Sequence, residues 1–153
     1  MLRVTLNDAL KTAMKAKDQR VTSTLRLIMA ALKDRDIAMR GTGSPDPISD
    51  EAILEMLQKM IKQRHESIDM YQKGNRADLV TQEQEEIAII ERFLPKQMDE
   101  AEIAQAVDAA IAAVGATSIK DMGRTIAVLK KDYSGRMDFA KASGVVKHRL
   151  GVA

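Results

Sequence analysis

Cysteine and tryptophan are both absent from this sequence of 153 residues. Without thiols the chain has no disulfide, no thiolate metal ligand and no cysteine nucleophile. Aromatic residues make up only 3% of the chain, so the core must be built from aliphatic side chains and from the ten methionines. The scarcity of aromatics also argues against a surface on which single-stranded bases stack.

Long apolar runs are also missing, and none approaches the roughly 18 residues that a membrane-spanning helix requires. The first 17 residues carry Lys11, Lys15 and Lys17 and in this respect resemble a targeting helix. Asp8 and the continuous run into the next helix instead favour a structural segment. We therefore expect no membrane partner and a cytoplasmic location.

Apolar residues recur at helical spacing along almost the whole chain, and Leu, Ile, Ala and Met enter helices at little cost. This pattern predicts an all-α fold. Pro95 separates two groups of predicted helices. We therefore predict an N-terminal multihelical domain with long antiparallel helices at 1–95 and a small C-terminal three-helix bundle, a tail-like domain, at 97–153.

Capping and breaking residues position the individual helices. The segment 41–47 contains two glycines and two prolines, which is typical of a loop. Asp99 and Glu102 have the spacing of a capping box. The predicted helix starts follow Asp18, Ser49, Asn75, Asp99, Ser118 and Asp138, and the predicted ends fall at Lys73 before Gly74, at Leu94 before Pro95, at Gly115, near Lys131 and at Leu150.

The C-terminal third is basic, with eight Lys and Arg against three Asp and Glu in residues 109–153. The apolar residues of its short helices must turn inward, which leaves the cations outside. A rigid basic surface is sufficient to meet the phosphates and 2′-hydroxyls of an RNA helix, although the same residues could simply keep the bundle soluble. The candidate nucleic-acid-binding residues are Lys120, Arg124, Lys130, Lys131, Arg136, Lys141, Lys147 and Arg149.

Two glycines, Gly123 and Gly144, fall inside these predicted helices. Each costs roughly 0.5–1 kcal/mol relative to alanine, so we expect a compensating contact. The first explanation is a close approach between two helices. The second is an exposed stretch of backbone that contacts RNA or a partner.

The groups that catalysis requires are largely missing. The two histidines, His65 and His148, stand among charged residues on predicted helices and lack a nucleophile or metal ligands at suitable spacing. The loop 41–44 lacks the lysine with which a phosphate-binding loop ends. We therefore predict no catalytic residue, no metal and no cofactor.

Two charged residues interrupt the apolar stripes of the two helices on either side of Gly74. Arg64 lies ten residues before this glycine and Glu83 nine residues after it. At about 1.5 Å per residue the two side chains stand nearly level in an antiparallel pair. We predict a structural ion pair between Arg64 and Glu83 that fixes the register of the helical hairpin, because charges are rarely buried unpaired.

Five segments resemble the GatB/YqeY family, and together they span nearly the whole chain: 24–33 (TLRLIMAALK), 61–67 (IKQRHES), 74–79 (GNRADL), 93–95 (FLP) and 120–123 (KDMG). The chain is similar to the stand-alone YqeY-like members and to the C-terminal helical and tail region of the GatB subunit of aspartyl/glutamyl-tRNA amidotransferase. The catalytic cradle of GatB has no counterpart here. The resemblance implies a two-part helical fold and an association with tRNA.

Three hypotheses for function follow. The first is a non-catalytic binding protein associated with tRNA, with an amidotransferase or with another translation-related protein. Similarity alone would assign it carbon–nitrogen ligase activity with glutamine as amido-N-donor. The second is a protein–protein adaptor that binds through Met14, Met29, Met56 or Met70, since methionine surfaces adapt to partners. The third is an enzyme acting on an amide or aminoacyl bond through Glu83 or His65.

Overall fold

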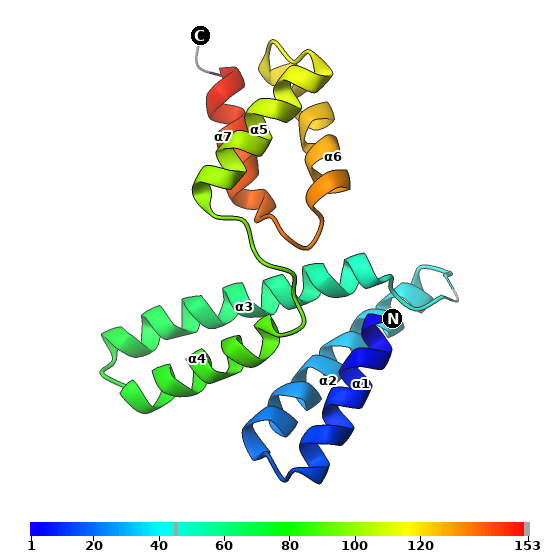
Figure 1. Cartoon of the computed structure of the whole chain (residues 1–153), viewed down its shortest axis with the longest axis vertical. Coiled ribbons are helices and arrows are strands. Elements are labelled where there is room, and N and C mark those ends of the chain that lie inside the picture. The colour runs from blue at the N-terminus through cyan, green and yellow to red at the C-terminus, as the bar shows by residue number, and fades with distance from the viewer. Residues whose placement is uncertain (45, 152–153) are drawn as a thin grey trace. The chain divides into compact units, whose positions relative to one another are not determined.

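The computed structural model describes residues 1–44 and 46–151, and this part of the chain contains seven α-helices and no strand (Figure 1). The predicted all-α fold is confirmed. The chain divides into two compact units, Met1–Pro95 and Lys96–Ala153. Whether each unit folds independently, as the domains predicted at 1–95 and 97–153 imply, stays a prediction. Pro45 of the predicted 41–47 loop, together with residues 152–153, lies outside the described residues.

The first unit consists of two helical hairpins, α1 (Leu2–Lys15) with α2 (Gln19–Gly41), and α3 (Asp50–Lys73) with α4 (Ala77–Glu91). Within each hairpin the helices run antiparallel, and α4 also packs on α2 (Figure 1). The core is aliphatic, as the scarcity of aromatics requires. Its most deeply buried side chains are Leu6, Leu25, Ile28, Leu32, Ile53, Met56, Leu57 and Ile90.

Two of the predicted helix starts in this unit are confirmed by their caps. The Asp18 carboxylate accepts a hydrogen bond from the Val21 N–H at 3.2 Å, and the Ser49 hydroxyl accepts one from the Ala52 N–H at 3.2 Å. Each bond satisfies a backbone donor that the first helical turn leaves unpaired.

The predicted limits of α4 were wrong at both ends. Asn75 does not cap this helix but adopts a left-handed conformation, with φ +57°, which asparagine tolerates better than most residues. The N-cap position is occupied by Arg76, whose side chain makes no capping bond. The helix ends at Glu91 rather than at Leu94, because residues 92–94 form a turn before Pro95.

An ion pair that was not predicted joins α1 to α2 and also holds the connection between α2 and α3 through the backbone of Ile48. Two nitrogens of Arg3 donate to the two carboxylate oxygens of Asp36, at 2.7 and 2.8 Å. Asp36 also accepts from the Ile48 N–H at 3.0 Å, and Arg3 donates to the Ile48 carbonyl at 3.3 Å. The Arg3 guanidinium lowers the pKa of Asp36. Ile48 is thereby held in the core, where it is buried.

The second unit consists of α5 (Glu100–Val114), a 3-10 turn η1 (Ile119–Asp121), α6 (Met122–Tyr133) and α7 (Phe139–Gly151). The three α-helices all pack against one another (Figure 1). Their apolar side chains form a separate core, which contains Ile103, Ala106, Val107, Ala110, Leu129, Met137, Ala142 and Val146.

The predicted limits of α5 are confirmed. Asp99 and Glu102 form the reciprocal capping box, with the Asp99 carboxylate accepting from the Glu102 N–H at 2.8 Å. Gly115 ends the helix in the left-handed conformation, with φ +64°, which glycine adopts without steric cost.

The single helix predicted from Ser118 is instead a 3-10 turn followed by α6. The Asp121 carboxylate accepts from the N–H groups of Thr117 and Ser118, at 2.9 and 3.2 Å, and from the Arg124 guanidinium at 2.6 Å. These donors all favour the charged form and lower the pKa of Asp121 to about 2. One carboxylate therefore fixes the junction between the α5–α6 connection and α6.

We expect Asp121→Asn to lower the thermal unfolding midpoint at neutral pH. Because the folded-state pKa of Asp121 is depressed, its stabilising contribution is complete above the unfolded value near 3.8 and is lost as the pH falls toward about 2. The difference in midpoint between the native chain and the variant should therefore shrink over this interval in a pH series of thermal melts. Asp132→Asn, at an exposed position on α6, is the control. An unchanged difference at pH 2 would contradict the assignment.

Candidate nucleic-acid interface and the buried ion pair

All eight candidate cations of the second unit are exposed, as predicted. Lys120 belongs to η1, and Arg136 lies in the connection between α6 and α7. The helix α6 carries Arg124, Lys130 and Lys131, and α7 carries Lys141, Lys147 and Arg149.

The three arginines are engaged within the unit. Arg124 donates to the Val114 carbonyl at 3.2 Å in addition to Asp121, and Arg149 donates to Asp108 at 3.0 Å. Arg136 donates to the Lys96 carbonyl at 3.4 Å. The five lysines, in contrast, form no salt bridge within residues 1–44 and 46–151. The lysine ammonium groups are therefore the cations available to an external anion.

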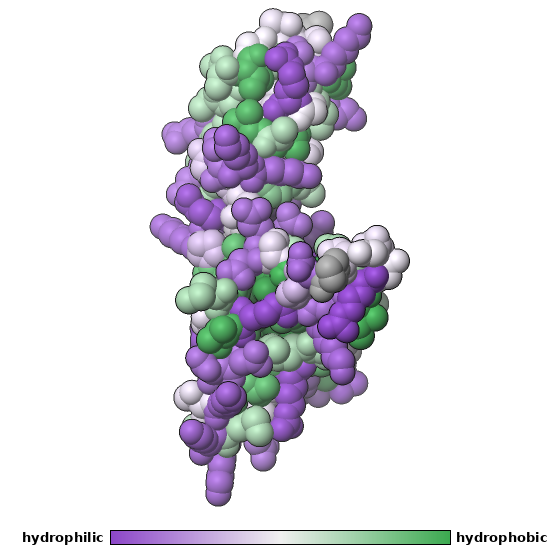
Figure 2. Space-filling view, turned by 90° about the vertical axis from the view of Figure 1, so that its right-hand side faces the viewer, coloured by the Kyte–Doolittle hydropathy of each residue, from purple (hydrophilic) through white to green (hydrophobic). Residues whose placement is uncertain are grey.

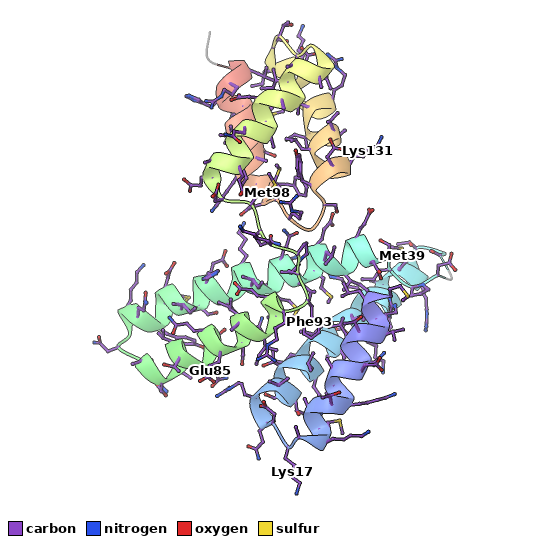
Figure 3. The ribbon with its side chains drawn as sticks, in the orientation of Figure 1. Lys17, Met39, Glu85, Phe93, Met98 and Lys131 are labelled. Atoms are coloured by element: carbon purple, nitrogen blue, oxygen red, sulfur yellow. The ribbon has the colours of Figure 1, made fainter. Side chains whose placement is uncertain are left out.

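The structure does not gather the eight cations on one face. Lys131 projects outward from α6, on the side away from α7 (Figure 3). The lysines of α7 belong to a different face, because Lys141 and Lys147 flank the exposed Gly144 at three-residue steps, whereas Ala142 and Val146 are buried. We define the α7 face as Lys141, Gly144, Lys147 and His148.

Two hollows border the α7 face. One, of about 440 Å³, lies between α5 and α7, and the other, of about 390 Å³, lies between α7 and η1. Gly144 and His148 line both. The first hollow is lined by Glu100, Ile103, Ala104, Lys141, Gly144, Val145, His148 and Arg149, and the second by Ile119, Gly144, Lys147, His148 and Gly151.

The packing explanation for the two helix glycines was wrong. A Cβ atom built on Gly123 or on Gly144 would meet no atom within 4 Å apart from its own helical turn and chain neighbours. Neither glycine therefore permits a close approach of another helix. At Gly144 in particular, which lies in the middle of α7, the cost of about 0.5–1 kcal/mol relative to alanine remains uncompensated by the fold.

Arg64 and Glu83, the predicted ion pair of the first unit, lie 3.9 Å apart. The hydrogen bond of the Arg64 Nε, however, goes to Glu86 Oε2 at 2.9 Å. Glu86 is the more deeply buried carboxylate and also accepts from Gln82 at 3.3 Å. Arg20 of α2 approaches it to 4.0 Å and bonds the neighbouring Glu85 at 3.0 Å. Glu86 therefore joins α3 to α4, and the adjacent Glu85 attaches α2 to the same turn of α4.

Glu86 is not among the residues that were predicted from the sequence. The available signal was its spacing, since it lies three residues after Glu83 and four before the buried Ile90. Burial and the charge of Glu86 raise the pKa of Glu83. The charged form of Glu83 is therefore less favourable in the folded protein than in the unfolded chain.

The groups named for catalysis do not converge. His65 is exposed on α3, and Glu83 lies beside Arg64 and Glu86 rather than beside a nucleophile. In the described ranges no three His, Asp or Glu side chains approach one another as they would around a metal ion.

None of the described helices alone is long and apolar enough to cross a membrane. The pair formed by α5 and residues 119–133, which is bent by 97°, has the length and apolar composition of a span when the two segments are taken together.

The comparison with known families covers both units. Residues 3–150 match the family model described as Yqey-like protein. The chain belongs to this family. The YqeY domain occurs as a stand-alone protein and at the C-terminus of GatB, which confirms the resemblance found in the sequence.

Curated relatives of this YqeY protein come from fungi and are named Altered inheritance of mitochondria protein 41, mitochondrial. Those from Eremothecium gossypii and Lachancea thermotolerans are 36% identical over 89 residues, and one from Saccharomyces cerevisiae is 34% identical over the same length. The match covers 58% of this chain and 46% of each relative, so it spans about half the length of the curated proteins. The predicted cytoplasmic location is contradicted, because these relatives are named as mitochondrial proteins.

We expect Glu86→Gln to lower the free energy of unfolding by about 3 kcal/mol, because it leaves the Arg64 charge buried without its hydrogen-bonded carboxylate. Denaturant titration at pH 7 measures this loss. Glu85→Gln, at an exposed neighbour, should cost less than about 1 kcal/mol.

Glu83→Gln should behave differently and leave stability at pH 7 unchanged or higher. The raised pKa means that folding disfavours the charged form of Glu83. The variant with the neutral glutamine should therefore have a free energy of unfolding at pH 7 that is equal to or higher than that of the native chain. This gain should disappear below the unfolded pKa of 4.5, where the native carboxyl is protonated. If Glu83→Gln destabilises the protein more than Glu86→Gln does, then Glu83 rather than Glu86 is the partner that fixes the hairpin.

Proposed function

We propose that this YqeY protein is a non-catalytic RNA-binding protein and that its second unit binds tRNA through the exposed lysines. The observation that supports this proposal is the difference in bonding between the arginines and the lysines among the eight cations. The arginines hold the helices of the unit together, whereas Lys120, Lys130, Lys131, Lys141 and Lys147 face solvent without a carboxylate partner among the described residues.

The chemistry of these lysines suits a double-helical RNA. Ammonium groups on long stems bind phosphates as point charges and do not require a particular base sequence. A helical RNA presents phosphates and 2′-hydroxyl groups across its wide minor groove, so a firm basic surface without aromatic side chains is adequate. The second unit contributes only Tyr133 and Phe139 as aromatics, and both pack against its core.

The family adds support for tRNA as the RNA. The YqeY domain also stands at the C-terminus of GatB. The resemblance found in the sequence associates that region with holding tRNA while other parts of the enzyme carry out the reaction. Binding is therefore the role of this chain, and the carbon–nitrogen ligase reaction belongs to an amidotransferase, which is a candidate partner.

The adaptor hypothesis receives less support from the positions of its four methionines. Met56 is buried in the first core and Met29 packs against it, while Met14 and Met70 are exposed on different helices. The face in Figure 2 is mainly hydrophilic, with hydrophobic residues in small separate groups. These methionines therefore do not form a continuous surface for a protein partner.

We expect the purified chain to bind tRNA with an affinity that falls steeply with salt. Because the five lysines lie on more than one face, we expect about three of them to contact phosphates at once, and raising the salt from about 50 to 200 mM should then weaken binding by roughly 40-fold. Fluorescence anisotropy with labelled tRNA measures the slope. Failure to bind tRNA at 50 mM salt would overturn the proposal and favour the hypothesis of a protein partner.

Replacing both Lys141 and Lys147 by glutamine should reduce the slope of log affinity against log salt by about 2, because each lost phosphate contact removes nearly one unit. The matched control is the double variant Lys59→Gln and Lys62→Gln, which removes two exposed lysines from α3 in the first unit. If the control lowers the slope and the α7 variant does not, the binding surface does not lie on the second unit.

A further inference from the structure

Gly144 lies in the middle of α7 and faces away from the core of its unit. The side chains of Ala142 and Val146, on the opposite side of the helix, are completely buried. A Cβ atom at Gly144 would have open space around it. The fold therefore gives no reason for a glycine here, and the absence of a side chain affects only what approaches from outside.

The residues around Gly144 on the helix surface are basic or small. Positions three and four residues away are the neighbours on an α-helix, and these are Lys141, Lys147, His148 and Ala140. Lys141 and His148 lie seven residues apart, which corresponds to about 10 Å along the helix axis. Bare backbone is thus placed between hydrogen-bond donors that suit an anion.

The two hollows leave room on both sides of this bare backbone. Apolar side chains line both hollows, Ile103, Ala104 and Val145 beside α5 and Ile119 beside η1. Glu100, in the first turn of α5, is the one acid among the residues that line the hollows. The hollows are lined by these apolar side chains and also by Lys141, Lys147 and Arg149, which favours an occupant with negative charges around an uncharged centre.

From this arrangement we infer that the α7 face is the central contact for an RNA strand, with a ribose against the backbone at Gly144 and the adjoining phosphates bound by Lys141, Lys147 and His148. A ribose is uncharged and lies between two phosphates, which matches the bare centre and its basic surroundings. Helix carbonyl oxygens keep a second lone pair after they accept the helical hydrogen bond, so they can accept from the 2′-hydroxyl. This inference rests on the proposed RNA binding and adds that the site distinguishes RNA from DNA.

The substitution Gly144→Ala tests this contact without destabilising the fold. Alanine has space at this position and is the better helix former, so the midpoint of thermal unfolding should rise by about 1–4 °C. The affinity for an RNA duplex should nevertheless fall severalfold, because the methyl group occupies the place of the ribose. Gly144→Leu, with a larger side chain and good helix propensity, should reduce the affinity by at least about tenfold.

Gly41→Ala is the matched control, since the last residue of α2 is an equally open helical glycine in the other unit. It should leave the RNA affinity unchanged. Each variant is compared on an RNA duplex and a DNA duplex of the same sequence at one salt concentration. The native chain should prefer RNA by about tenfold, and Gly144→Leu should narrow this preference.

The outcomes separate the two proposals. If the native chain binds neither tRNA nor the RNA duplex, the proposed function fails and the contact at Gly144 fails with it. If the native chain binds RNA while Gly144→Ala and Gly144→Leu bind within twofold of it and keep the same preference over DNA, RNA binding stands and the inference is overturned. Circular dichroism of the two variants shows that a loss of affinity does not come from unfolding.

Discussion

The hydrogen bond between Arg64 and Glu86 is the interaction on which the arrangement of the first unit depends. It joins α3 to α4 beside a core that is built from aliphatic side chains. A buried charge pair is costly unless both charges are satisfied, so it favours the register at which Arg64 meets its carboxylate. Arg20 of α2 bonds the neighbouring Glu85 and approaches Glu86 to 4.0 Å, so α2 is attached to the same acidic segment of α4.

Most of the local structure could be predicted because it depends on neighbours in sequence. The cap at Ser49, the capping box of Asp99 and Glu102 and the left-handed end at Gly115 each involve side chains and backbone within one turn. The prediction that Asn75 caps α4 was wrong for a related reason, since asparagine is common both at helix caps and in left-handed turns. Propensity alone does not decide between these two conformations.

The residues that tertiary packing determines were harder to predict. Spacing placed Arg64 opposite a carboxylate of α4, but the choice between Glu83 and Glu86 depends on how the helix is rotated about its axis. The ion pair of Arg3 with Asp36 joins residues 33 positions apart, and no periodicity indicates it. In the second unit the outward position of the cations followed from the apolar pattern, whereas the bond from Arg149 to Asp108 required the packed helices.

The different use of arginine and lysine in the second unit has a consequence for how such a surface can change. Arg124 and Arg149 connect parts of the unit through oriented hydrogen bonds, so replacing either one disturbs a contact between helices. Lys141 and Lys147 are exposed and have no such partner among the described residues, so replacing them alters only the electric field outside the protein. If the second unit binds a polyanion as proposed, the strength of that attraction can change over generations, one lysine at a time, while the helical scaffold beneath stays the same.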